Sequence, residues 1–332
     1  MNDTRTVRPR GQERSRHAAA GKAEARQEQV RQALRPGQSI ELLKELHILT
    51  REGELNQDSR RKLKQVYHLY GFIEKILQDL EAGGRQEVTL ADHGAGKSYL
   101  GFIVYDLYFS QRTGGTIYGI ETRRELVERS QELARRLGFE RMAFLPLTVQ
   151  ESEHSAELPE QIDVVTALHA CDTATDDAIA FGLAKHARDM VLVPCCQAEV
   201  ASCLRQGKAL QLARTPLAEL WRHPLPTREI GSQITNVLRC LYLESQGYSV
   251  TVTELVGWEH SLKNELILAH YTGHRKRSAA ERMQAIAEEF GLHELLARRY
   301  PRVAEVLTAD AAHAASAPEP GLSPQVPEDG RI

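Results

Sequence analysis

The 332-residue sequence has no run of about 20 apolar residues, and no apolar segment follows its N-terminus. Neither a transmembrane helix nor a signal peptide is therefore predicted. Its five cysteines are odd in number and two of them, Cys195 and Cys196, are adjacent, which is a poor basis for a disulfide framework. A formal net charge of −3 gives no overall excess of positive charge for nucleic acid. We expect a cytoplasmic protein with reduced thiols.

Charge is nevertheless uneven along the chain. Met1–Arg35 contains nine Arg or Lys residues against four acidic ones and lacks an apolar period, which predicts a disordered basic arm over residues 1–38. Residues 39–84 carry apolar side chains at intervals of three and four and end at Gly83 and Gly84, as expected of a helical extension. The Ala- and Pro-rich residues 301–332 are predicted to form a disordered tail.

Between these parts, short β-rich runs alternate with helical ones. The strand-like runs are "EVTLAD", "GTIYGIE", "MAFLPLT", "IDVVTALHA" and "DMVLVPCC". Such alternation predicts a mainly parallel, doubly wound α/β sheet covered by helices, here over residues 85–300. Further along, "YSVTVTELVG" is predicted to be a strand and "EHSLKNEL" a polar turn leading into a helix.

The turn after the first strand-like run allows two interpretations, of which a phosphate-binding P-loop is the first. Ala91–Ser98 follows the pattern A-x-x-x-x-G-K-S, one residue short of that motif. A P-loop enzyme also needs a strand that ends in a metal-holding aspartate. The best candidate, Asp172, follows His169 and Cys171 where apolar residues are expected, so this interpretation is the weaker one.

The second interpretation is a turn that holds S-adenosylmethionine. Asp92–Gly96 follows the pattern D-x-G-x-G, in which Gly94 and Gly96 let the backbone approach the methionine part of the ligand. Asp92 can accept hydrogen bonds there, and Lys97, which directly follows the turn, is also assigned to cofactor binding. Tyr99 stands where a dinucleotide fingerprint needs its third glycine, which argues against NAD.

The next two strands supply the remaining cofactor contacts. Glu121 ends "GTIYGIE", and an acid at that place can accept hydrogen bonds from both ribose hydroxyls, although it can also cap the helix that follows. Thr148 and Val149 follow the third strand, where they would border the adenine.

Histidine and cysteine gather after the fourth and fifth strands, in "ALHACDTATDD" and "VPCCQ". Neighbouring parallel strands end at one edge of the sheet, so these residues should converge around the reacting group. Asp172 or His169 would orient or deprotonate the acceptor, and His169 would also contact the cofactor. Cys195 and Cys196 are interpreted as small residues under the ligand, with a zinc site that includes Cys171 as the alternative. We predict no metal.

The motifs "DHGAGKSYLGF", "LHACDTATDDAI", "PCCQ", "LRCLYLESQGY" and "HSLKNELILAH" resemble the methyltransferase domain of the glutathione S-transferase C-terminal-domain-containing protein and its bacterial relatives. More distantly they are similar to the enzyme that 2′-O-methylates the tRNA acceptor stem. The resemblance covers about residues 62–270. It implies a class I, seven-stranded, Rossmann-like methyltransferase sheet that uses S-adenosyl-L-methionine.

The resemblance also implies residue roles. It places Asp92, Gly94, Gly96 and Glu121 at the cofactor, and His169, Asp172, Pro194, Cys195 and Cys196 at the active mouth. Lys263 is a family-like position too, and it would contact an anionic substrate.

The distant tRNA relative suggests methyl transfer to N or O of an RNA acceptor, tRNA or rRNA. This sequence lacks that enzyme's zinc-finger segments and has Asp172 where that enzyme carries glycine. A protein or small-molecule acceptor and a non-catalytic S-adenosylmethionine-binding module are therefore alternatives, and the oligomeric state is left open.

Overall fold

A computed structural model of the chain describes residues 28, 30–168, 172–194, 197–206, 220, 223–255 and 265–315, with side chains as far as residue 308. The chain divides into two compact units. The first comprises Met1–Cys196 and Thr251–His270, and the second comprises Gln197–Val250 and Tyr271–Ile332. None of the helices in these described stretches is long and apolar enough to cross a membrane.

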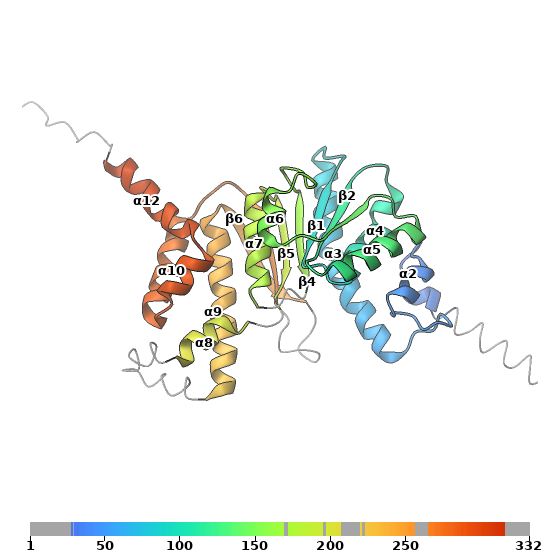
Figure 1. Ribbon diagram of the computed structural model, residues 1–332, viewed down its shortest axis with the longest axis horizontal. Helices are drawn as coiled ribbons and strands as arrows, with labels where there is room; N and C mark the ends of the chain where they lie inside the picture. The colour runs from blue at the N-terminus through green and yellow to red at the C-terminus, as the bar shows by residue number, and fades with distance from the viewer. Residues whose placement is uncertain are drawn as a thin grey trace, which may run out of the picture. The chain divides into compact units, whose positions relative to one another are not determined.

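The sheet confirms the predicted fold class. Its strands are β1 (Thr89–His93), β2 (Thr116–Ile120), β3 (Met142–Leu145), β4 (Val164–Leu168), β5 (Asp189–Val193), β6 (Tyr248–Glu254) and β7 (Glu265–Tyr271). They form one seven-stranded sheet in the order β3-β2-β1-β4-β5-β7-β6, with β1 to β5 parallel and β7 antiparallel to β5 (Figure 1). This is a Rossmann-like, doubly wound sheet with an antiparallel strand added beside β5.

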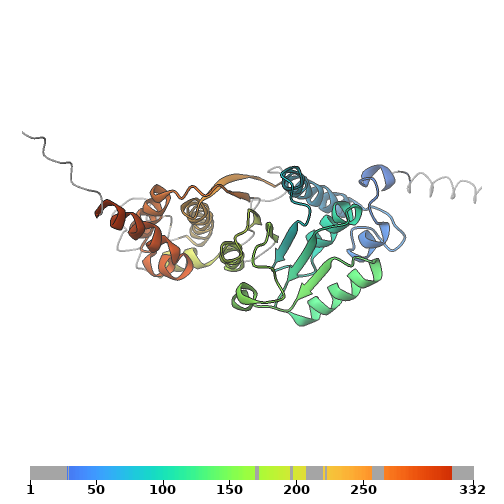
Figure 2. The same ribbon diagram turned by 90° about the horizontal axis from the view of Figure 1, so that it is seen from above.

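The parallel strands are buried because helices flank them. All five residues of β5 are buried, which is the continuous apolar pattern expected of a strand covered on both faces. The flanking helices of the first unit are α4 (Tyr99–Leu107), α5 (Arg124–Leu137), α6 (Val149–His154) and α7 (Ala174–Ala184). Helix α4 contacts β2, α7 contacts β4 and β5, and α5 runs along β3 (Figure 2).

The predicted helical extension forms α2 (Ile40–Glu45) and α3 (Gln57–Ala82). Asn56 caps α3 by accepting a hydrogen bond from the Ser59 N–H, and Gly83 ends it. Its buried residues recur every three or four positions and face the apolar core of this unit, and α3 contacts α4. The extension is therefore part of the first unit.

The second unit contains α8 (Glu199–Arg205), α9 (Pro224–Ser245), α10 (Arg277–Phe290), α11 (His293–Arg299) and α12 (Arg302–Ala315). Two sequence predictions are wrong, one for α12 in this unit and one for β7. Residues 302–315 are helical rather than disordered, because their many alanines favour a helix. Glu265–Tyr271 is a strand rather than a helix, because pairing with β5 overrides the local pattern.

Candidate functional site

The strand order fixes where a ligand should bind. The chain adds β2 and β3 on one side of β1 and then crosses to place β4 on the other side. A crevice forms where the strand order reverses in this way, outside the carboxyl ends of the strands. The glycine turn Gly94–Ser98 leaves β1 at that point and leads into α4.

The turn is tightly held against the end of β2. Gly94 and Gly96 have φ angles of 67° and 58°, a left-handed conformation that strains most other residues. The Ala95 N–H donates to the Ile120 carbonyl at 3.0 Å, and the Gly96 N–H donates to Glu121 Oε2 at 2.8 Å. The predicted turn and the predicted acid are thus joined by a hydrogen bond.

Asp92, at the end of β1, is hydrogen-bonded to the glycine turn through Ser98. It is 2% exposed, and its carboxylate accepts hydrogen bonds from the Thr166 hydroxyl at 3.0 Å and the Ser98 hydroxyl at 3.3 Å. Burial raises the pKa of Asp92 to about 6, although hydrogen bonds from Thr166, Ser98 and the Gly101 backbone oppose that shift. Because its partners are neutral, this carboxylate lacks a countercharge.

Ser98 bears on the P-loop interpretation. Its side chain is fully buried and turns toward Asp92, with a φ angle of 51° at the start of α4. A P-loop serine must instead reach the magnesium ion beside the phosphates. The geometry of Ser98 therefore favours the other interpretation of the turn.

Glu121 follows β2 and is 7% exposed. The Arg123 Nε donates to Glu121 Oε1 at 3.0 Å and the Arg123 NH2 donates to Oε2 at 3.1 Å, while the Arg123 backbone N–H donates to Oε1 at 3.1 Å. Burial would raise the pKa of Glu121, but the bonds and charge of Arg123 and the Gly96 N–H outweigh it and lower the pKa to about 2. The carboxylate is therefore ionised at neutral pH.

A cavity of about 600 Å³ opens over the glycine turn. Asp92, Gly94–Lys97 of the turn and Leu168 are among the residues that line it. Three cationic side chains line the same cavity, namely Lys62, Lys97 and Arg123. Asp92 is the one acidic residue among its described lining residues, and Glu121 is not among them.

The helical extension supplies part of this cavity, which the sequence did not predict. Leu46, His47 and Ile48 follow α2, and Lys62, Gln65 and Val66 come from α3. His47 has a φ angle of 53°, a conformation that is uncommon outside glycine and occurs at functional sites. An amphipathic period identifies the buried face of a helix but gives no sign of which exposed residues face a ligand.

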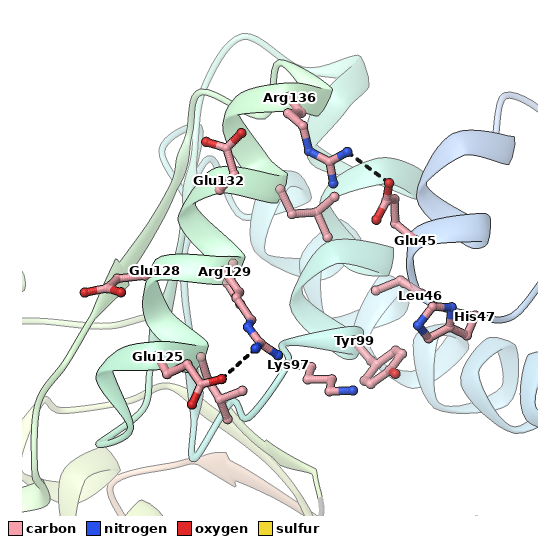
Figure 3. A pocket seen from close by; sticks show the side chains of 13 residues that line it. Glu45, Leu46, His47, Lys97, Tyr99, Glu125, Glu128, Arg129, Glu132 and Arg136 are labelled. Carbon is pink, nitrogen blue, oxygen red and sulfur yellow. Dashed lines mark hydrogen bonds and ion pairs between the residues drawn. The ribbon is translucent and has the colours of Figure 1, made fainter.

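A second cavity of about 610 Å³ lies between α2 and α5 and shares His47, Lys97 and Tyr99 with the first. Figure 3 shows two ion pairs among its lining residues: Arg136 with Glu45, which joins α5 to α2, and Arg129 with Glu125, within α5. Both of these arginines are therefore paired with an acid.

His93 is a buried group that the sequence did not single out. It is 5% exposed, it packs on Phe181 at 5.3 Å between ring centroids, and neither ring nitrogen has a hydrogen-bond partner among the described residues. Burial lowers the pKa of His93 to about 4, against the opposing charge of Glu121. The side chain is therefore neutral at pH 7.

The other predicted site residues differ in what is described. Thr148 caps α6 through a reciprocal pair of bonds with Glu151, and Val149 is the first residue of α6; neither lines the cavity. Asp172, with a φ angle of 53°, precedes α7. The remaining predicted residues lie outside the described residues, and they are His169, Cys171, Cys195, Cys196 and Lys263. Within the described chain, no group of three or more His, Cys, Asp or Glu residues is arranged to hold a metal ion.

Comparison with known proteins supports the fold and the enzyme class. Residues 61–203 match a family model described as "Methyltransferase domain". The comparison with curated proteins gave no match.

Several solved structures are similar over the sheet at low identity. An rRNA methylase from Streptococcus thermophilus is 9% identical with a TM-score of 0.35, covering 56% of this chain and 87% of its own. Magnesium protoporphyrin IX methyltransferase from Synechocystis PCC 6803 with bound SAH is 13% identical with a TM-score of 0.38, covering 70% and 93%. Aeropyrum pernix fibrillarin with natively bound S-adenosyl-L-methionine is 13% identical with a TM-score of 0.33, covering 55% and 66%. At these values the three structures carry no argument about the substrate.

The family match covers β1 to β5, the glycine turn and Glu121. Residues 61–203 therefore match a methyltransferase domain, whose cofactor is S-adenosylmethionine. The more specific resemblance to the glutathione S-transferase C-terminal-domain-containing protein is not confirmed by these comparisons.

Proposed function

We propose that this protein transfers a methyl group from S-adenosylmethionine to a nitrogen or oxygen of an RNA acceptor, tRNA or rRNA. The observation that supports this is the cavity at the strand-order reversal, which is lined by the glycine turn and by three cationic side chains. Lysine and arginine at the mouth of a donor pocket suit an acceptor that carries phosphates.

The residues at this point fit the cofactor. Glu121 is ionised and can accept hydrogen bonds from both ribose hydroxyls, since each of its oxygens now takes one bond from the Arg123 side chain. Gly94 and Gly96 leave the turn open to the methionine part of the cofactor, because no side chain projects from either. When bound, the cofactor supplies an electrophilic methyl group on a positively charged sulfur.

The protein's share of the chemistry would then be alignment and proton removal. Holding donor and acceptor in line converts an encounter of two molecules into a step within one complex. We assign orientation or deprotonation of the acceptor to Asp172 or His169, which follow β4 at the same edge of the sheet. Cys195 and Cys196 would border the acceptor after β5, and Lys263 would contact its phosphate.

Isothermal titration of the full chain with S-adenosylmethionine and separately with ATP·Mg²⁺ tests the cofactor assignment. Glu121→Ala should weaken S-adenosylmethionine binding about 10-fold to 100-fold, because two hydrogen bonds to a charged acceptor are lost. Glu125→Ala is the matched control, since Glu125 is an exposed acid nearby on α5 that pairs with Arg129. Equal affinity of Glu121→Ala and the wild type, or binding of ATP alone, would reject the assignment.

Methyl transfer from labelled S-adenosylmethionine to total RNA and to total protein tests the acceptor. We expect label in RNA, lost in a variant that carries both Asp172→Ala and His169→Ala. Label in protein would replace the RNA acceptor with a protein acceptor, and donor binding without label in any fraction would indicate a non-catalytic binding module.

A further inference from the structure

The guanidinium of Arg123 occupies the place where the proposed function puts the ribose. It covers Glu121, so the cavity is lined by Arg123 and not by the acid. It also lies over the glycine turn, because a methyl group added at Gly96 would stand 3.8 Å from the Arg123 NH2. A nucleoside that binds Glu121 must displace this side chain.

The geometry of the ion pair explains why the Arg123 guanidinium and the ribose of the donor compete for Glu121. The guanidinium directs two parallel donors at the two carboxylate oxygens, at 3.0 Å and 3.1 Å. The vicinal hydroxyls of a ribose would present the same pattern of two donors to two oxygens. The bonds from the Gly96 and Arg123 backbone N–H groups do not involve the guanidinium, and they can persist when it leaves.

Displacement is feasible and leaves a free cation at the cavity. The Arg123 side chain is 66% exposed, so water surrounds most of it and the pair with Glu121 is of moderate strength. Lys62 and Lys97 line the same cavity and have no hydrogen-bond or ion-pair partner among the described residues. A released guanidinium would join two unpaired ammonium groups, and this arrangement suits phosphate groups.

We propose that Arg123 couples the two substrates: it neutralises Glu121 in the empty site, is displaced by the donor's ribose, and then binds a phosphate of the RNA acceptor beside Lys62 and Lys97. This inference rests on the proposed function and adds a residue that links donor and acceptor binding. By linkage, the acceptor must then strengthen donor binding as much as the donor strengthens acceptor binding.

Titration of the full chain with S-adenosylmethionine alone tests the displacement. Arg123→Ala should bind the donor about 3-fold to 10-fold more tightly than the wild type, because no ion pair has to be broken. Arg123→Lys keeps the charge without the two-pronged contact and should lie between them. Arg129→Ala, which removes an exposed arginine paired with Glu125 on α5, should match the wild type. Donor binding by Arg123→Ala that is no tighter than wild type would overturn the inference.

The same titration with unfractionated tRNA at saturating concentration tests the coupling. In the wild type, tRNA should tighten donor binding by about 3-fold to 10-fold; in Arg123→Ala it should have no effect. A wild-type affinity that tRNA leaves unchanged, or an equal gain in both proteins, would overturn the coupling. Glu121→Ala separates this inference from the proposed function. If that variant binds the donor as tightly as the wild type, the donor site itself is misassigned. If Glu121→Ala weakens donor binding but the Arg123 variants show none of the expected changes, only the coupling is rejected.

Discussion

The ends of β1 and β2 are neighbours in the sheet, paired through Asp92 with Gly119 and His93 with Ile120, yet they treat charge in opposite ways. At the end of β1, burial raises the pKa of Asp92 to about 6 and lowers that of His93 to about 4, so each pKa shifts in the direction that favours the neutral form. After β2, Glu121 is nearly as buried, but its pKa is lowered to about 2.

Hydrogen-bond and ion-pair partners account for much of the difference between the pKa values, and fewer protein atoms also surround Glu121 than surround Asp92 or His93. Asp92 accepts hydrogen bonds from two hydroxyl groups and one backbone N–H, and His93 has no hydrogen-bond partner in the part of the chain that the structure describes. Glu121 accepts hydrogen bonds from a guanidinium, two backbone N–H groups and the Thr122 hydroxyl. A charge is stable in a protein interior only where charged or numerous donors replace water. The β1 end therefore supports the turn, while the β2 end keeps an ionised acceptor ready for a ligand.

His93→Phe should produce the largest effect on this contrast. The folded-state pKa of His93 lies below its ordinary value of 6.5, so its contribution to stability is present above pH 6.5 and is lost as the pH falls toward 4. At pH 5 the wild type should have lost about 2 kcal/mol relative to pH 7 through this group. The phenyl ring does not titrate and fits beside Phe181, so the variant should escape that loss.

Urea denaturation at pH 5 and pH 7 measures the difference between the two proteins. Groups other than His93 titrate alike in both and cancel. Parallel stability changes in the wild type and in His93→Phe would show that His93 finds a partner in solution and that the β1 end does not suppress its charge.

Sequence patterns predicted the framework of this contrast and missed its partners. The alternation of strands and helices placed Asp92, Gly96 and Glu121 at strand ends, because that placement depends on local periodicity and turn residues. The ion pair between Arg123 and Glu121 depends on the direction in which the Arg123 side chain points, and the hydrophobic periodicity of the sequence does not predict that direction. His93 was missed because the sequence of an apolar strand does not show whether a histidine in it will have a hydrogen-bond partner.

The limits of local sequence patterns also explain the two wrong predictions of secondary structure. Strand β7 has its hydrogen bonds with β5, about 80 residues earlier in the chain according to its register, so the local turn-like composition before it was misleading. For α12, the Ala- and Pro-rich composition of residues 301–332 predicted a disordered tail, whereas alanine has the highest helix propensity. The contribution of α2 and α3 to the cavity depends on tertiary packing alone.

Asp92→Asn should have a smaller effect, in the opposite direction along the pH axis. The folded-state pKa of Asp92 lies above its ordinary value, so its contribution to stability is present below pH 3.8 and is lost as the pH rises through 6. Between pH 5 and pH 7 the wild type should lose about 1 kcal/mol through this group, and the asparagine variant should not. Urea denaturation of both proteins across this range measures it; a difference that stays constant with pH would mean that Asp92 is ionised as easily as an exposed carboxyl.

Arg123→Ala should have the smallest effect on stability of the three variants. It tests whether the Arg123 side chain is what keeps the pKa of Glu121 low. The pair between Arg123 and Glu121 is mostly exposed on the arginine side, so its loss should lower the free energy of unfolding by about 0.5 kcal/mol, comparable to Arg129→Ala. The pKa of Glu121 should rise toward 4.5, because the countercharge is gone while two backbone N–H groups remain. Thermal unfolding at pH 7 and NMR titration of the Glu121 carboxyl measure these two quantities. A stability loss above about 2 kcal/mol would instead make Arg123 a structural support of the turn, and the tighter donor binding expected of this variant would then have no physical basis.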